Sequence, residues 1–173
     1  KEDLLYETMR GGAAAFHGAL DSVPDDAPPA EKVRLALRAH LGVVADQLDL
    51  ATVFVQEWRY LEGERLEEIV AERRRYEERI RELFREGRDL GDLRADLDVN
   101  AAALAFLSAA NWVYTWLAPG ADTDALADRF REQARHDGIA APFLAFVEQP
   151  GLPSPGEWGF DAAVEFPPHG FAA

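Results

Sequence analysis

The sequence predicts an all-α fold, a helical bundle that is followed by an irregular C-terminal tail. Apolar residues recur at three- and four-residue spacing through most of residues 2–135, which is the period of an amphipathic helix. Only one short segment could suit a strand, and no second alternating segment exists to pair with it. Residues 101–118 are apolar except for Ser108, Asn111 and Thr115, which fall along one side of a helix.

Two amphipathic helices and a short third one are expected in the first part of the chain. Residues 2–20 and 30–48 each place apolar residues on one face at helical spacing. The proline-rich segment 21–30 is expected to be the loop between them. Residues 49–63 include the short β-branched run that would suit a strand, but because it has no pairing segment, a short helix ending near Gly63 is expected.

The fourth predicted helix, residues 64–86, is long and highly charged. Arg73 interrupts its apolar stripe at a position where an apolar residue would be expected. Glu77 and Arg81 stand four residues apart on the outer face, a spacing at which an ion pair stabilises a helix by roughly 0.2–0.5 kcal/mol.

A connector is expected after this helix, with Gly87 and Gly91 as the residues that stop it. The last helix is expected to begin with Asp122 or Thr123 as its cap and to run to about Arg135.

The apolar helix at 101–118 is expected to be buried on most sides, because its circumference is apolar nearly all round. It is therefore a central core helix, a subunit interface, or both. Asp98 and Asn100 can cap its start, and Pro119 and Gly120 are expected to end it. A membrane span is disfavoured, because the segment is rich in alanine and acidic residues flank it on both sides.

The character of the chain changes at Asp137. Residues 137–173 hold six of the ten prolines and no lysine or arginine. We therefore expect two parts, a helical domain at 1–136 and an appendage at 137–173 that is rich in proline and glycine.

Composition narrows the classes of function. The net charge of −14 disfavours binding of nucleic acid by this chain alone, because phosphate backbones attract basic surfaces. The absence of cysteine excludes a disulfide framework, a thiolate metal site and a cysteine nucleophile. The N-terminal residues are charged and precede no apolar signal segment, so a cytoplasmic protein is expected.

No pattern for catalysis or metal binding stands out. None of the three serines lies in a Gly-x-Ser-x-Gly elbow, and no two histidines have metal-ligand spacing. His40 lies on an apolar face, where a hydrogen-bonded core or pocket histidine is favoured over a metal ligand. We therefore predict no catalytic residue, no metal site and no cofactor.

The order of elements resembles a known family. Residues 1–6, KEDLLY, look like the start of the fourth helix in TetR-type transcriptional regulators, and residues 86–120 look like the connector and eighth helix of that family. The charged helix with Tyr76 is similar to the seventh. The features that carry the resemblance in the eighth helix are Asn111, Trp112, Trp116, Pro119 and Gly120.

This resemblance covers residues 1–136 and implies a ligand-binding and dimerisation domain. The family's three DNA-binding helices have no counterpart here, so DNA is expected to be bound only through a missing N-terminal helix-turn-helix. Aromatic residues fall on three neighbouring predicted helices; each could simply fill the core, but the resemblance implies that some line a pocket. The implied ligand-binding residues are Phe54, Trp58, Arg73, Tyr76, Asn111 and His40.

Regulators that resemble this subgroup often sense fatty-acyl or related CoA thioesters. The resemblance therefore implies a small hydrophobic or acyl-CoA-type ligand, with Arg73 meeting a carboxylate or phosphate unless it pairs with a nearby glutamate. A homodimer is expected to form through residues 101–135. The expected interface residues are Leu104, Leu107, Trp112, Trp116 and Phe130.

Two other functions stay open. Residues 159–170, GFDAAVEFPPHG, look like a short stretch of bacterial polysaccharide-biosynthesis proteins with a glycoside-hydrolase-99-like domain. That resemblance implies an enzyme fragment fused to a helical domain, in which no catalytic role can be given to Asp161 or Glu165. The third class is an interaction module without a ligand.

Overall fold

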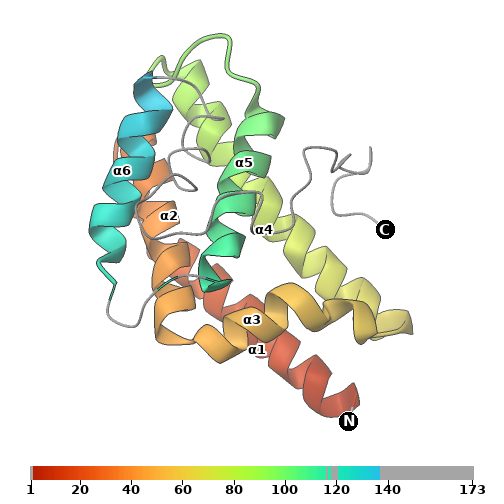
Figure 1. The fold of residues 1–173 in the computed structure, drawn as a ribbon. Coiled ribbons are helices and arrows are strands. Elements are labelled where there is room, and N and C mark those ends of the chain that lie inside the picture. Colours follow the sequence, from red (N-terminus) through yellow and green to blue (C-terminus); the bar gives the residue numbers. More distant parts are fainter. Residues whose placement is uncertain (1, 116, 118–120, 137–173) are drawn as a thin grey trace, which may run out of the picture.

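The computed structural model describes residues 2–115, 117 and 121–136, and describes residues 130–136 by their backbone only. Within these residues every regular element is a helix, so the all-α prediction is confirmed (Figure 1). The elements are α1 (Glu2–Asp21), α2 (Pro29–Asp46), α3 (Leu48–Gln56), the 3₁₀ helix η1 (Glu57–Tyr60), α4 (Gly63–Asp89), α5 (Val99–Trp112), the 3₁₀ turn η2 (Val113–Thr115) and α6 (Thr123–His136).

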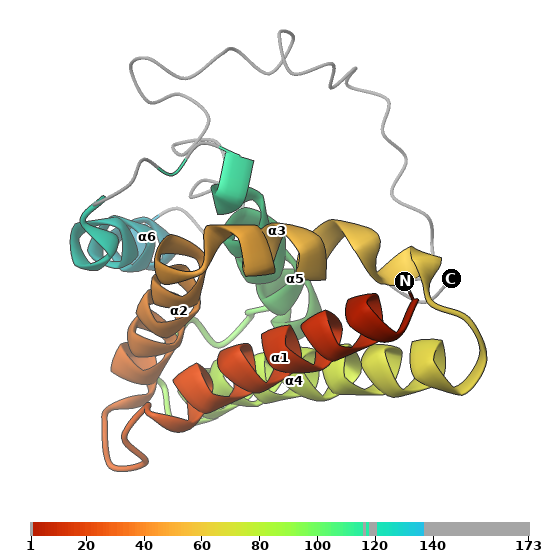
Figure 2. The same ribbon diagram turned by 90° about the horizontal axis from the view of Figure 1, so that it is seen from below.

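Helix α2 holds the bundle together, because it contacts each of the other five α-helices. Helix α1 lies along the long helix α4, and α3 crosses close to α1 (Figure 2). Helix α6 packs against α2, and α5 packs against α4 and α2. The short segment after α2, for which a helix was expected rather than a strand, forms α3 and η1.

The core lies where α1, α2, α4 and α5 meet. Burying one large apolar side chain contributes roughly 1.5–3 kcal/mol. The largest side chains with almost no exposed surface are Phe106, Met9, Leu37, Leu41, Leu61, Ile69, Ile80, Val44 and Val113.

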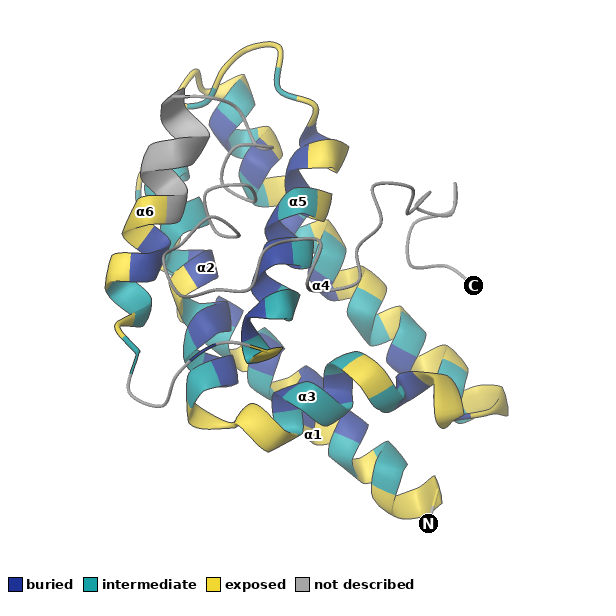
Figure 3. Ribbon diagram, in the orientation of Figure 1, coloured by how far each residue is buried: buried dark blue, intermediate teal, exposed yellow. Residues whose placement is uncertain are grey.

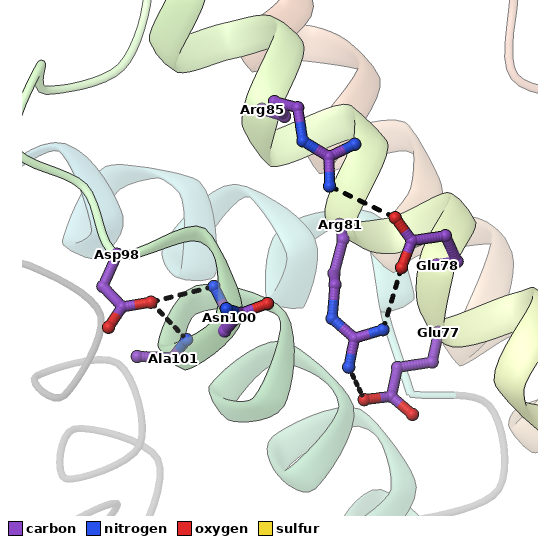
Figure 4. A network of polar contacts seen from close by, with 7 residues as sticks. All are labelled: Glu77, Glu78, Arg81, Arg85, Asp98, Asn100 and Ala101. Atoms are coloured by element: carbon purple, nitrogen blue, oxygen red, sulfur yellow. Dashed lines mark hydrogen bonds and ion pairs between the residues drawn. The ribbon is translucent and has the colours of Figure 1, made fainter.

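Two predicted features of α4 have different outcomes. Glu77 and Arg81 form the expected ion pair, and Glu78 also accepts from Arg81 (Figure 4). Gly87 does not end the helix, which continues to Asp89. A Cβ at Gly87 would lie 2.6 Å from the Cδ1 atom of Leu93, so the glycine allows this close approach.

The ends of α5 are set by hydrogen bonds from side chains. The carboxylate of Asp98 accepts from the backbone N–H groups of Asn100 and Ala101 at 2.9 and 3.0 Å, which confirms Asp98 as the cap (Figure 4). Asn100 lies inside the helix. The α-helix ends at Trp112, earlier than expected, and the Thr115 hydroxyl donates to the Trp112 carbonyl at 2.8 Å in the 3₁₀ turn that follows.

Helix α5 is buried on one face only. Figure 3 shows both buried and exposed residues along α5. The buried residues are part of the core, whereas Ala101 and Leu104 are exposed on the outer face. Helix α6 begins at Thr123, where the Asp122 carboxylate accepts from the Ala125 N–H at 2.9 Å and so acts as the cap. Among the described helices, none is long and apolar enough to cross a membrane. The appendage predicted at 137–173 lies outside the described residues.

Candidate ligand-binding cavity

A cavity of about 50 Å³ lies among α1, α2, α3, α4 and α5. Since a single water molecule needs roughly 10–15 Å³ of such space, the cavity is large enough for water but small for a ligand. Its walls combine apolar side chains with a few polar groups, as ligand sites usually do. The lining residues are Ala13, Phe16, His17, His40, Phe54, Glu72, Arg73, Tyr76, Glu77, Leu107 and Asn111.

The structure brings together five of the six residues that were expected to bind a ligand. Only Trp58 does not line the cavity, but its ring stacks on the guanidinium of Arg73 from outside. The sequence did not single out the α1 residues Phe16 and His17 as part of the site. The inward position of Phe16 at helical spacing was visible, but nothing indicated which helix α1 would face.

His40 and Tyr76 form a buried polar pair between α2 and α4. The Nδ1 atom of His40 lies 3.1 Å from the Tyr76 hydroxyl oxygen. The ring of Phe16 covers the imidazole, with 4.6 Å between the ring centroids. Both helices turn these residues inward, so His40 is only 2% exposed and Tyr76 only 8%.

Burial controls the protonation of both groups. It lowers the pKa of His40 to about 3, because an imidazolium has no compensating charge there, so His40 is neutral at neutral pH. Burial raises the pKa of Tyr76, which keeps the phenol protonated. Within the described part of the chain, the Nε2 atom of His40 has no hydrogen-bond partner.

Arg73 is held by a carbonyl group and two aromatic rings. Its Nη1 atom donates to the Phe54 carbonyl oxygen at 3.0 Å. The guanidinium carbon lies 5.1 Å from the ring centroid of Phe54 and 5.2 Å from that of Trp58, within the range of a cation–π interaction. Burial, and then the positive charge of Arg59, lower the pKa of Arg73 to about 10, which leaves it charged at neutral pH.

The expected alternative was an ion pair between Arg73 and a nearby glutamate, and none forms within the described residues. Among the described residues no carboxylate oxygen lies within 4.0 Å of its guanidinium. The two carboxylates of the cavity wall have other partners, because Glu77 pairs with Arg81 and Glu72 pairs with Arg75. The Nε2 atom of His17 also lies 3.4 Å from Glu72.

The residues expected at a dimer interface do not all lie on the same face of α5. Leu104 is 37% exposed on the outer face of α5, and Trp112 is half-buried. Leu107 faces the other way, lines the cavity and is only 6% exposed, so it offers a partner subunit almost no surface. The side chains of Trp116 and Phe130 lie outside the described residues.

Metal binding finds no support in this part of the chain. The described residues contain no group of three or more histidine, aspartate or glutamate side chains that could hold a metal ion.

Solved structures with the same fold belong to bacterial regulators. The TetR-family regulator PfmR from Thermus thermophilus superposes with a TM-score of 0.72 at 26% identity, over 79% of this chain and 72% of that one. A tetR-family regulatory protein from Rhodococcus RHA1 gives 0.70 at 26% identity, over 77% and 71%. AibR, in complex with isovaleryl coenzyme A and operator DNA, gives 0.67 at 26% identity, over 82% and 75%.

Of the two sequence comparisons, the one with family models agrees with the structural result. None of the curated proteins matches the sequence. The sequence model of the family described as Tetracyclin repressor-like, C-terminal domain, matches residues 26–136, which is well over half of the chain and includes most of the cavity wall. The chain therefore belongs to the TetR family of transcriptional regulators and contains its C-terminal domain.

Proposed function

We propose that residues 1–136 are the effector-sensing and dimerisation domain of a cytoplasmic TetR-like repressor, and that the effector is a small hydrophobic or acyl-CoA-type ligand. One observation carries this proposal. A charged arginine, Arg73, lies on the wall of a mainly apolar cavity and has no carboxylate partner among the described residues. An amphipathic ligand with an anionic group matches both properties.

The cavity wall offers groups that suit both parts of such a ligand. Phe16, Phe54 and Leu107 provide apolar walls for an acyl chain. Arg73 provides positive charge, and the amide of Asn111 makes no side-chain hydrogen bond within the described residues. The small volume favours a short acyl chain, with the bulky coenzyme outside. AibR supports this class, because its structure contains isovaleryl coenzyme A.

Ligand binding would act through α1. Ala13, Phe16 and His17 of this helix line the cavity, so a ligand that shifts them shifts α1 itself. In the intact repressor, a movement of this helix would change the spacing of two DNA-binding domains and release the operator. A coupling free energy of about 1–3 kcal/mol is typical between such sites.

A thermal shift series tests the ligand class. The chain is mixed with acyl-CoAs from short to long chain, and free CoA is the reference. At about a hundredfold excess over its dissociation constant, a ligand should stabilise the fold by about 2.7 kcal/mol. For a chain of this size the melting temperature should rise by roughly 5–10 °C.

Substitution of arginines identifies the site in the same assay. Arg73→Gln should abolish most of the shift, whereas Arg88→Gln, which alters a half-buried arginine that pairs with Asp89 and does not line the cavity, should preserve it. If the acyl-CoAs raise the melting temperature no more than free CoA does, the apolar walls of the cavity are ordinary core. Failure of every chain length would remove the acyl-CoA class. It would then favour a ligand-free interaction module, with which the small cavity volume also agrees.

A further inference from the structure

The buried pair of His40 and Tyr76 determines which nitrogen of His40 carries the proton. A neutral imidazole has one N–H group and one acceptor nitrogen. If the Tyr76 hydroxyl donates to Nδ1, the proton of His40 is on Nε2. If instead Nδ1 donates to the hydroxyl oxygen, the proton of Tyr76 has to find another acceptor.

The surroundings of the pair distinguish these two arrangements. Among the described residues, His40 is the only hydrogen-bond partner of the Tyr76 hydroxyl. In the second arrangement both the phenol proton and the lone pair of Nε2 would be buried without a partner. In the first arrangement only the Nε2–H group is left over. Because each unmatched buried polar group is costly, the hydroxyl of Tyr76 donates and the Nε2 atom of His40 carries the proton.

Some polar groups of the cavity wall have no hydrogen-bond partner among the described residues, and most of these groups are donors. Nε2–H of His40 is one, and within the described residues Arg73 uses one of its five N–H groups, toward the carbonyl of Phe54. The carboxylates of Glu72 and Glu77 are already engaged by arginines. Asn111 can supply either role.

We propose that the ligand of this cavity presents an acceptor oxygen, the carbonyl or carboxylate oxygen of a short acyl group, to the Nε2–H group of His40. The inference rests on the proposed ligand-binding function and specifies the chemistry of the ligand. It favours acyl compounds over alkyl compounds and alkylammonium ions of the same shape, because neither of these has an oxygen that can accept from Nε2–H.

Access to Nε2 requires a change in packing. The atom is buried in the described state, and the Phe16 ring lies over the imidazole. The ligand oxygen therefore reaches Nε2 only when the side chains around the imidazole repack, and Phe16 is one of them. Since Phe16 belongs to α1, recognition of the oxygen is linked to displacement of that helix.

The first experiment measures the tautomer without any ligand. A long-range ¹H–¹⁵N spectrum of the histidine side chains reports which ring nitrogen is protonated, and His40→Gln assigns the signal. We expect a protonated Nε2 and an unprotonated Nδ1. Tyr76→Phe should remove this preference, whereas Tyr60→Phe, at a residue that is 71% exposed, should leave it unchanged. A proton on Nδ1 in the unmodified chain would overturn the inference.

The second experiment compares ligands that differ by one oxygen. Butanoyl-CoA and S-butyl-CoA have the same chain and coenzyme, but only the first has a carbonyl group. We expect the thioester to bind roughly 3- to 10-fold more tightly, the effect of one hydrogen bond. In His40→Leu the ratio should fall to about one. Butanoate and butylamine, measured in the same way, show whether a free carboxylate is also accepted.

The outcomes separate the two proposals. Equal binding of the matched pair, or tighter binding of S-butyl-CoA, overturns the role of His40 and leaves the acyl-CoA function intact. Absence of binding by all four probes overturns the proposed ligand class and this inference with it. If His40→Leu does not fold, two measurements still test the role of His40. One is the tautomer in the unmodified chain. The other is the ratio of the affinities for butanoyl-CoA and S-butyl-CoA in Tyr76→Phe, which should be smaller than in the unmodified chain.

Discussion

His40 and Arg73 lie on the same cavity but respond to burial differently. With a pKa of about 3, His40 is neutral at neutral pH, whereas Arg73, with a pKa of about 10, keeps its charge. The difference follows from their ordinary pKa values, because burial lowers both but only that of His40 starts near neutrality. On the cavity wall, therefore, Arg73 contributes a positive charge at neutral pH and His40 contributes a neutral donor.

The buried histidine should make stability depend on pH. Its pKa is lower in the folded chain than the ordinary 6.5, so below pH 6.5 the unfolded chain binds a proton that the folded chain does not. Folding stability should therefore be lost as the pH falls from 6.5 toward 3. Between pH 7 and pH 5 the loss attributable to His40 should be about 2 kcal/mol.

Urea denaturation at the two pH values measures this loss. The chain and its His40→Leu variant are compared, because other groups contribute equally to both. The variant should show a change in unfolding free energy that is smaller by about 2 kcal/mol. Identical changes in both proteins would show that His40 is not buried in its neutral form.

Some residues of the site could be predicted from the sequence because they interrupt a hydrophobic pattern, and others could not. Arg73 was recognisable because it breaks an apolar stripe, and His40 because it lies on an apolar face. The hydrogen bond from Arg73 to the carbonyl of Phe54 could not be predicted, because every residue has a backbone carbonyl and the residue type does not show which one accepts. The inward direction of Leu107 was missed for another reason. An almost entirely apolar helix gives no signal for which face is inside.

At the scale of the elements, the contact between α1 and α3 depends on one glycine. A Cβ placed on Gly12 would lie 2.7 Å from the Cδ2 atom of Phe54 and 2.9 Å from its Cγ atom. The same ring also packs against Phe16, with 5.4 Å between centroids, and under Arg73. Gly11, its neighbour in the helix, has no atom within 4 Å of an added Cβ.

These two glycines form a matched pair for mutation. Alanine in place of glycine stabilises a helix interior by about 1 kcal/mol, so Gly11→Ala should stabilise the fold by up to that amount. In Gly12→Ala the same gain is opposed by overpacking against Phe54, which typically costs about 1–3 kcal/mol. A net loss of about 1 kcal/mol is expected. Chemical denaturation measures both variants, and equal stabilisation by the two would show that α3 can move away freely.

The order of the helices was predictable from periodicity, but some of their ends were not. Gly87 and Gly91 looked alike as stops after α4. Only Gly91 adopts a left-handed backbone, with φ of 81°, whereas Gly87 remains helical and makes room for Leu93. The two roles follow from tertiary packing and not from the residue type. Similarly, nothing in the apolar run indicated that α5 would change to a 3₁₀ turn at Val113.

At the scale of the whole molecule, no other helix among the described residues packs on the outer face of α5. Leu104 is 37% exposed there, beside Ala101. The expectation of a subunit interface at 101–135 therefore stays a prediction, now centred on this face and not on Leu107. A net charge of −14 does not favour close approach of two copies, so apolar contact has to supply the free energy of association.

Sedimentation tests this interface. The unmodified chain should be a dimer at micromolar concentration. Leu104→Asp should weaken association at least tenfold, because burying an unpaired carboxylate in an interface costs more than about 1.4 kcal/mol. Leu4→Asp is the control, since Leu4 is 74% exposed and lies near the N-terminal end of α1, away from α5 (Figure 1). A stable monomer of the unmodified chain would exclude the proposed dimer.

The contact that Arg73 of α4 makes with the last turn of α3 has a consequence for how the domain without ligand is stabilised. Phe54 contributes one of the carbonyl groups that a helix leaves unpaired at its C-terminus, where the helix dipole is negative. The negative end of this dipole therefore favours the charged guanidinium, as does the more distant charge of Glu77, which raises the pKa of Arg73. An incoming anion does not have to break a buried pair between arginine and carboxylate. The roughly 3–5 kcal/mol that disrupting such a pair costs is therefore not subtracted from its affinity.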